Sequence, residues 1–322
     1  MFNGLAHFVK GGIFFWYGML TLGRWMGCFA DMGWAWNMKP TADVVGRRKA
    51  TMPSAEFVES FLIFFYGATN VFMEHMAAWG GAWTAQDLEH VSISVMFFGG
   101  GLVNILLLGL HNWIRLIIVQ CGMLVESKKI RNLLNTSLLT KSGTHAVQSS
   151  NELLQAPRTY GFSLNPLPGL IILLLGIMMS SHHQSSMVST MVHKQWGTLF
   201  VGASLARAVS YILTYLSPPT SLLPSRPPSE IITAFCLISG GLIFMASVRT
   251  LRNSSWKAVT NRLQNKDTVA AMEAYNLNAM FSFTVTMGLT AFLMAWTIVV
   301  MAVKGWAVRR QQVPSFDTRI SP

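Results

Sequence analysis

The stretch LPGLIILLLGIMMSS (Leu167–Ser181), with the stretch MVSTMVHKQWGTLFVGASLARAVSYILTYL (Met187–Leu216) soon after it, decides the fold class. Apolar blocks of roughly 20 residues recur along the chain, and this length crosses a hydrocarbon layer at about 1.5 Å per residue. Because a backbone in lipid must satisfy its own hydrogen bonds, such blocks form helices. The sequence therefore predicts an all-α fold, a polytopic bundle of transmembrane helices.

The composition agrees with a membrane location. Of the 322 residues, 52% are hydrophobic and 11% are charged, whereas soluble domains carry about 25% charged residues. The net charge of +11 comes from Lys and Arg in the loops between apolar blocks, where they orient helices and meet lipid headgroups. We expect an integral membrane protein whose main partner is the lipid bilayer, without nucleic acid; the host membrane and the oligomeric state stay open.

About seven spans are expected, in one membrane domain over residues 1–306. The predicted spans are about Phe8–Phe29, Ala55–Ala78, His90–Val125, Leu167–Ser181, Met187–Leu216, Glu230–Val248 and Ala279–Val303. Ser54 is the predicted N-cap of the second span, and the prolines of Ser217–Pro228 favour an extended connector. Residues 127–162 are expected to form a polar loop, and residues 307–322 a disordered tail.

Ionisable side chains inside the spans are candidate functional groups, because each costs about 2.5–3.5 kcal/mol to insert. In the second span, Glu59, Asn70 and Glu74 fall on one helix face, and His75 lies on its flank. This polar stripe is expected to point into the bundle. His90 opens the third span.

Arg207 lies well inside the fifth span. A guanidinium at this depth needs a carboxylate or carbonyl partner. We expect that partner to be Glu59 or Glu74.

The segment SSHHQSSMVSTMVHKQWG (Ser180–Gly197) carries three histidines. In a continuous helix, His182, Ser186, Ser189 and His193 share one face, since they are spaced by four, three and four residues. A break near Gln184 would instead set two helix ends face to face. Both geometries bring imidazoles together in an apolar bundle.

Three interpretations of these groups remain open. They organise helix packing or partner contacts without chemistry, they hold haem b through histidine axial ligands, or they bind a divalent metal, for which imidazole and carboxylate suit zinc or iron. A bound haem or metal would serve electron transfer. The sequence identifies neither catalytic residues nor an enzymatic activity. The predicted cofactor-binding residues are His90, His182, His183 and His193. The predicted metal ligands are Glu59, Glu74, His75, His183 and His193.

Five stretches carry a family resemblance. They are HFVKGGIFFWYG (His7–Gly18), AEFVESF (Ala55–Phe61), AQDLEHVS (Ala85–Ser92), SSHHQSSMVSTMVHKQWG (Ser180–Gly197) and SPPTS (Ser217–Ser221). They resemble the fungal Ytp-type family of integral membrane proteins and, more distantly, the animal transmembrane-protein-forty-five family. The resemblance covers nearly the whole chain.

This resemblance implies a multi-span membrane protein likened to mitochondrial electron-transport proteins. The polar positions of its motifs are Glu59, His90, His182, His183 and His193, without an established ligand role. Many fungal members carry a further N-terminal membrane domain that resembles two-haem cytochromes. We therefore expect as partner either a redox protein or such an N-terminal membrane domain, which is absent from this chain. Residues 103–120 are extra relative to the family pattern, and their Val and Gln ends fit a retained intron.

Overall fold

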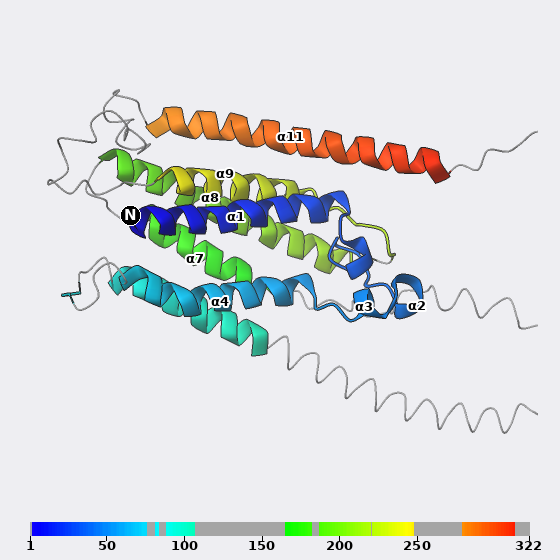
Figure 1. The fold of residues 1–322 in the computed structure, drawn as a ribbon, viewed down its shortest axis with the longest axis horizontal. Coiled ribbons are helices and arrows are strands. Elements are labelled where there is room, and N and C mark those ends of the chain that lie inside the picture. Colours follow the sequence, from blue (N-terminus) through cyan, green and yellow to red (C-terminus); the bar gives the residue numbers. More distant parts are fainter. Residues whose placement is uncertain are drawn as a thin grey trace, which may run out of the picture. The chain divides into compact units, whose positions relative to one another are not determined.

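The computed structural model describes residues 2–75, 81–83, 88–106, 165–181, 187–219, 221–247 and 279–312. Within the helices Phe2–Met26, Ala55–His75 and Ala279–Gln312, the side chains described are those of residues 7–26, 55–70 and 279–308. Every regular element in these ranges is helical, which confirms the all-α class (Figure 1). The elements are α1 (Phe2–Met26), η1 (Ala30–Met32), α2 (Ala42–Val45), α3 (Arg47–Ala50), α4 (Ala55–His75), the helix Leu88–Leu106, α7 (Leu167–Ser181), α8 (Met187–Leu216), α9 (Ser229–Ala246) and α11 (Ala279–Gln312).

Several predicted helix ends agree with the structure. Helices α7 and α8 begin and end at the predicted residues, and the prolines of the connector lie outside helices. The Phe57 N–H donates to Ser54 Oγ at 3.2 Å, which confirms Ser54 as the N-cap of α4. Helix α11 continues to Gln312, beyond the predicted start of the tail at residue 307.

The predicted number of seven spans is not confirmed. Four helices of the described residues are long and apolar enough to cross a membrane: Leu88–Leu106, Met187–Leu216, Ser229–Ala246 and Ala279–Val308. Helix α7 is apolar but has 15 residues, which is shorter than the roughly 20 that a span needs.

The chain divides into two compact units. Unit 1 comprises residues 1–28, 172–210 and 226–322, and unit 2 comprises residues 29–171 and 211–225. Each unit is described by itself below. The single domain over residues 1–306 stays a prediction.

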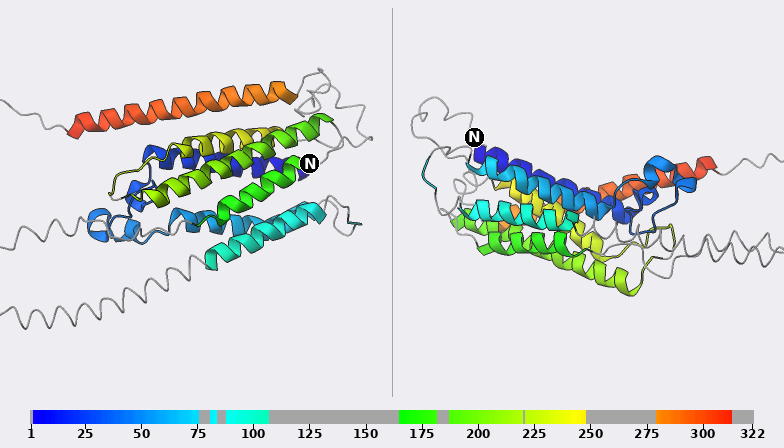
Figure 2. Two further views of the ribbon diagram at one scale, coloured as in Figure 1. Left: turned by 180° about the vertical axis from the view of Figure 1, so that it is seen from behind. Right: turned by 90° about the horizontal axis from the view of Figure 1, so that it is seen from below.

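In unit 1, α1 and α8 run parallel along one seam, side by side with α9 (Figures 1 and 2). Three contacts join α1 to α8: His7 with His193, Phe14 with Phe200, and Thr21 with Arg207. The two partners are 186 positions apart in each contact. The contacts recur every seven residues on both helices, which is the period of helices that share a continuous seam.

Helix α9 runs antiparallel to α1, and glycines let the two backbones approach. A methyl group on Gly11 would lie 2.6 Å from the Gly241 carbonyl oxygen, and one on Gly18 would lie 2.8 Å from the Ile238 nitrogen. Such distances leave no room for a side chain, so small residues are required at this helix interface. Beside the glycines, Leu22 packs in a buried apolar cluster with residues of α9 and α11.

Helices α7 and α8 pack against each other as an antiparallel pair. A methyl group on Gly176 would lie 2.7 Å from the Gly197 carbonyl oxygen and 2.9 Å from the Val201 nitrogen. In one continuous helix, Gly176 and Gly197 would be about 30 Å apart at 1.5 Å per residue. The continuous helix considered from the histidine spacing is therefore wrong. The predicted break near Gln184, with two helix ends face to face, falls on residues 182–186, which lie outside the described residues.

In unit 2, α4 packs along the helix Leu88–Leu106. Asn70 Nδ2 donates to Ser94 Oγ at 2.5 Å inside this pair. The ring of Phe64 lies 5.0 Å from that of Phe98, between centroids. The two helices are thus joined by both a polar and an aromatic contact.

Candidate functional site

The first candidate site is a pair of imidazoles in unit 1. The ring centroids of His7 on α1 and His193 on α8 are 6.1 Å apart, with an interplanar angle of 76°. His193 is buried and His7 is half-buried. Packing of α1 on α8 therefore brings together two histidines that are distant in sequence.

Local structure sets the tautomer of His193. Its Nδ1 lies 2.8 Å from the carbonyl oxygen of Ser189, one helical turn earlier. Because a carbonyl oxygen accepts and does not donate, Nδ1 carries the hydrogen, and in the neutral ring the lone pair is on Nε2. A histidine that ligates a metal commonly donates its other ring N–H to a backbone carbonyl in this way.

Aromatic rings enclose the histidine pair. Phe244 of α9 lies 5.3 Å from His7, and Trp196 lies 5.7 Å from His193, between ring centroids. Trp196 and Phe244 stack on each other at 4.3 Å with an interplanar angle of 12°. The imidazoles therefore lie in an apolar, closely packed environment.

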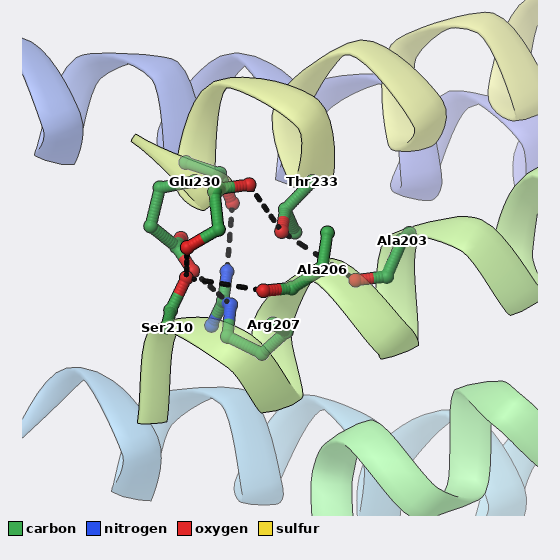
Figure 3. A network of polar contacts seen from close by, with 8 residues as sticks. Ala203, Ala206, Arg207, Ser210, Glu230 and Thr233 are labelled. Carbon is green, nitrogen blue, oxygen red and sulfur yellow. Dashed lines mark hydrogen bonds and ion pairs between the residues drawn. The ribbon is translucent and has the colours of Figure 1, made fainter. Parts of the chain in front are cut away.

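The second candidate site is a buried ion pair between α8 and α9 (Figure 3). Arg207 Nε lies 2.9 Å from Glu230 Oε1, and the two side chains are 6% and 0% exposed. Arg207 Nη2 also donates to Thr21 Oγ1 at 3.2 Å, and its guanidinium carbon lies 5.9 Å from the centroid of the Tyr17 ring. Opposite charge, a hydroxyl and an aromatic ring thus compensate the guanidinium inside the bundle.

Hydroxyl groups extend this network along the two helices, as Figure 3 shows. Ser210 Oγ lies 2.7 Å from Ser229 Oγ, and Thr233 Oγ1 donates to the Ser229 carbonyl oxygen at 3.2 Å. Glu230 lies in the first turn of α9, where the helix dipole favours a negative charge. These hydroxyl groups pair with each other or with a backbone carbonyl oxygen.

The ion pair corrects one prediction. The sequence predicts Glu59 or Glu74 as the partner of Arg207, but the carboxylate that pairs with it is Glu230. The sixth span is predicted to start at Glu230, and helix α9 begins one residue earlier, at Ser229. Antiparallel packing of α9 on α8 therefore puts this first-turn carboxylate beside Arg207.

The other predicted site residues fall into two groups. Glu59 and Asn70 are buried in unit 2, as expected for the inward stripe, and His90 is half-buried in the helix Leu88–Leu106 of the same unit. His182 and His183, and the side chains of Glu74 and His75, lie outside the described residues.

Among the side chains that the structure describes, no group of three or more His, Cys, Asp and Glu could hold a metal ion. The predicted histidine cluster is therefore not found in that part of the chain. His193, the one predicted cofactor ligand described in unit 1, is paired with His7.

Sequence reasoning missed His7 and Glu230 as site residues. One signal for His7 was available: His7, Phe14 and Thr21 are spaced by seven residues, and so are His193, Phe200 and Arg207. Matching heptad spacing predicts two helices that share a seam. The register between the two helices could not be read from that spacing.

Comparison with known proteins gives the family. The family model described as "Protein YTP1-like, C-terminal" matches residues 1–120 and 113–305. The chain belongs to this family. Membership confirms the resemblance inferred from the motifs.

Two relatives of this chain are named as uncharacterized membrane proteins. One, from Schizosaccharomyces pombe, is 37% identical over 310 residues, covering 96% of this chain and 53% of that protein. The other, from Saccharomyces cerevisiae, is 38% identical over 322 residues, covering 97% of this chain and 44% of that protein. Protein YTP1 of Saccharomyces cerevisiae is 23% identical over 202 residues, covering 62% of this chain and 32% of that protein.

The chain thus spans about half the length of the first two relatives. Their names and the apolar helices described above support one statement: the chain is an integral membrane protein. The two matched pieces of the family model meet near the predicted insertion over residues 103–120. Asn104 in this segment accepts a hydrogen bond from Asn165 Nδ2 at 2.6 Å, and residues 107–120 lie outside the described residues, so the insertion stays a prediction.

Proposed function

We propose that this integral membrane protein holds a redox-active transition-metal centre through the imidazoles of His193 and His7, and that the centre serves electron transfer. The observation that carries the proposal is the 6.1 Å separation of the two ring centroids, on helices from opposite parts of the chain. Placing an imidazole in an apolar bundle is costly. Two imidazoles in contact are therefore better explained by a ligand than by packing.

The chemistry of the donors fits a metal. Neutral imidazole suits Zn, Cu, Fe and Ni, and the tautomer of His193 set by the Ser189 carbonyl leaves the lone pair on Nε2. The apolar rings around the pair would raise the strength of each metal–ligand interaction and influence the reduction potential. When bound, a copper or iron ion would supply a site that gains and releases one electron.

The packing favours a single ion over haem. A haem would need room for a porphyrin between the two ligands, whereas Phe244 and Trp196 lie within 6 Å of the imidazoles, between ring centroids. His183 and His182 are proposed as further ligands of this centre, and His90 as a cofactor ligand. Glu59, Glu74 and His75, which belong to unit 2, are proposed as metal ligands, or as groups that orient metal ligands, within that unit.

The test combines metal analysis with an absorbance spectrum, recorded on oxidised and dithionite-reduced protein purified in detergent. We expect a stoichiometric transition metal in the wild type and its loss in His193→Ala and His7→Ala, with Lys194→Ala, at the exposed position beside His193, as the control. A Soret band with a sharpening α-band would identify the metal as haem iron. Well-folded protein that holds neither metal nor haem after expression in replete cells would contradict the proposal.

A second candidate function is non-enzymatic: the buried polar residues would organise helix packing or contacts with partner proteins. The network around Arg207 and Glu230 favours it, because the ion pair at 2.9 Å and the hydroxyl pair beside it join α8 to α9. The proposed N-terminal membrane domain, or another redox partner, would then bind the bundle for assembly rather than for electron transfer. This function would be favoured if His7→Ala and His193→Ala keep the stability of the wild type and its binding to partner proteins.

A further inference from the structure

The segment that joins α1 to α4, residues 29–54, is a folded loop. Trp34 Nε1 donates to the Pro53 carbonyl oxygen at 3.0 Å, and Lys39 Nζ donates to the Met52 carbonyl oxygen. Both bonds connect the beginning of the loop to its end. The loop therefore keeps one shape although its helices are short.

A second set of bonds ties this loop to the proline-rich connector of the same unit. The buried amide of Asn37 donates to the carbonyl oxygens of Ala30 at 2.7 Å and Leu222 at 3.0 Å. Ser225 donates to the Trp36 carbonyl oxygen through its backbone N–H at 3.2 Å and through Oγ at 2.7 Å. The loop and connector therefore form a preorganised surface, which loses little conformational entropy on binding.

Helix α3 presents three exposed basic side chains on this surface, those of Arg47, Arg48 and Lys49. Lys49 pairs with Asp31 at 2.5 Å, and its hydrogen bond lowers the pKa of that carboxyl. In the described part of the chain, the side chains of Arg47 and Arg48 form no ion pair with a carboxylate. Two guanidinium charges on this loop are therefore uncompensated.

Apolar side chains are exposed beside these charges. Val44, Met52 and Phe29 of the same loop are 66%, 38% and 37% exposed. The loop ends at Ser54, the N-cap of α4, and it is bonded to the connector that follows α8, a helix long and apolar enough to cross a membrane. The loop therefore lies at the level where α8 ends. Basic groups next to exposed apolar groups at this level are typical of segments that bind the headgroup region of a membrane.

We infer that loop 29–54 is a binding platform for anionic phospholipid headgroups, with Arg47 and Arg48 as the groups that contact the lipid phosphate and Val44 and Met52 as apolar anchors. Guanidinium groups bind phosphate oxygens through paired hydrogen bonds. Near an anionic surface, each basic residue strengthens binding by about fivefold. The platform would hold one class of lipid beside the bundle.

The experiment measures lipid selectivity of the full chain, reconstituted in phosphatidylcholine bilayers. Trace spin-labelled phosphatidylserine and phosphatidylcholine report the relative association constant of the two lipids by electron paramagnetic resonance. In Arg47→Gln/Arg48→Gln, the preference for phosphatidylserine should fall by up to about fivefold for each arginine removed. Asp31→Asn should raise it, because Lys49 then loses its intramolecular partner.

The matched control is Lys194→Gln/Lys304→Gln, which removes the same charge from exposed positions of α8 and α11 and should leave the preference unchanged. An unchanged preference in the arginine variant would overturn the proposal, and so would an equal fall in the control. Displacement of spin-labelled phosphatidylserine by soluble glycerophosphoserine at equal concentration would overturn the assignment to a lipid surface and indicate a free-phosphate site.

Discussion

The two polar sites of unit 1 lie two heptads apart on the same three helices. On α1 the step runs from His7 to Thr21, on α8 from His193 to Arg207, and on α9 from Phe244 back to Glu230. At 1.5 Å per residue, this step is about 21 Å. One helix scaffold thus supports both an imidazole pair among aromatic rings and a charge pair among hydroxyls.

The difference between the sites indicates different roles. At the Arg207 site, opposite charges 2.9 Å apart satisfy each other, which stabilises one arrangement of α8 and α9. At the His7 site, two groups of the same chemistry meet, and neither imidazole supplies the opposite charge that a carboxylate would give. We therefore propose a structural role for the first site and ligand binding for the second.

The largest effect is expected from breaking the buried ion pair. Glu230→Gln removes the carboxylate and leaves the Arg207 guanidinium inside the bundle, which should lower the free energy of unfolding by about 3–5 kcal/mol. The measurement is an unfolding titration in mixed micelles with increasing sodium dodecyl sulfate.

The double variant Arg207→Met/Glu230→Met is the control for this prediction. Because it removes both charges, its stability should return to near the wild-type value. If Glu230→Gln alone changes the free energy of unfolding by less than about 1 kcal/mol, which is the range of an exposed pair, the structural role is contradicted.

A smaller effect is expected from the glycine interface near the histidines. In Gly11→Ala the new methyl group would lie 2.6 Å from the Gly241 carbonyl oxygen, so α1 and α9 must separate, at a cost of about 1–3 kcal/mol. Gly11 is one turn from His7, and the same shift should weaken metal binding. The free energy of unfolding and the metal content are measured on the same protein.

The neighbouring residue provides the control. A methyl group on Gly12 meets nothing within 4 Å, so Gly12→Ala should keep the metal and gain up to about 1 kcal/mol from helix propensity. Equal losses of unfolding free energy and of metal content in the two alanine variants would show that neither quantity depends on the close approach of α1 and α9.

The smallest effect is expected at the exposed pair of Lys49 and Asp31. The hydrogen bond from Lys49 is the main cause that lowers the Asp31 pKa below its ordinary value of 3.8. The Asp31 carboxyl therefore binds a proton less readily in the folded state than in the unfolded state. The stabilisation is complete above pH 3.8 and is lost as the pH falls through the lowered pKa.

Because Asp31 is 41% exposed, the loss should stay below about 1 kcal/mol. Asp31→Asn should remove this part of the acid dependence, seen as a flatter profile of unfolding free energy against pH in the acidic range. A steeper profile for the variant than for the wild type would contradict the assigned sign.

Much of the fold was predictable because its signals are local. Apolar length predicted α7 and α8 to the residue, and the cap of α4 follows from the hydroxyl of Ser54. At α7, Asn165 Oδ1 accepts the Leu167 N–H at 3.1 Å, another local signal. Such features need no knowledge of the other helices.

The pairing of the sites was not predictable in the same way. His193 is identifiable from its own segment, but its partner His7 depends on the parallel register of α1 and α8. Glu59 on α4 is the more evident buried carboxylate for Arg207, while the actual partner Glu230 lies at a helix start. Register between membrane helices is set by glycine contacts and seams, which a single sequence specifies weakly.

The most direct test of the account is a metal titration of chelator-treated protein in detergent. The quantity measured is the number of metal ions bound per chain. We compare the wild type with His7→Ala/His193→Ala and with Arg207→Met/Glu230→Met. The account predicts stoichiometric binding in the wild type and in the ion-pair variant, and a loss of affinity of more than about 100-fold, the upper end of the effect of orienting groups, when the histidines are removed. Equal binding by all three proteins, or none by any, would contradict the assignment of the ligand site to His7 and His193.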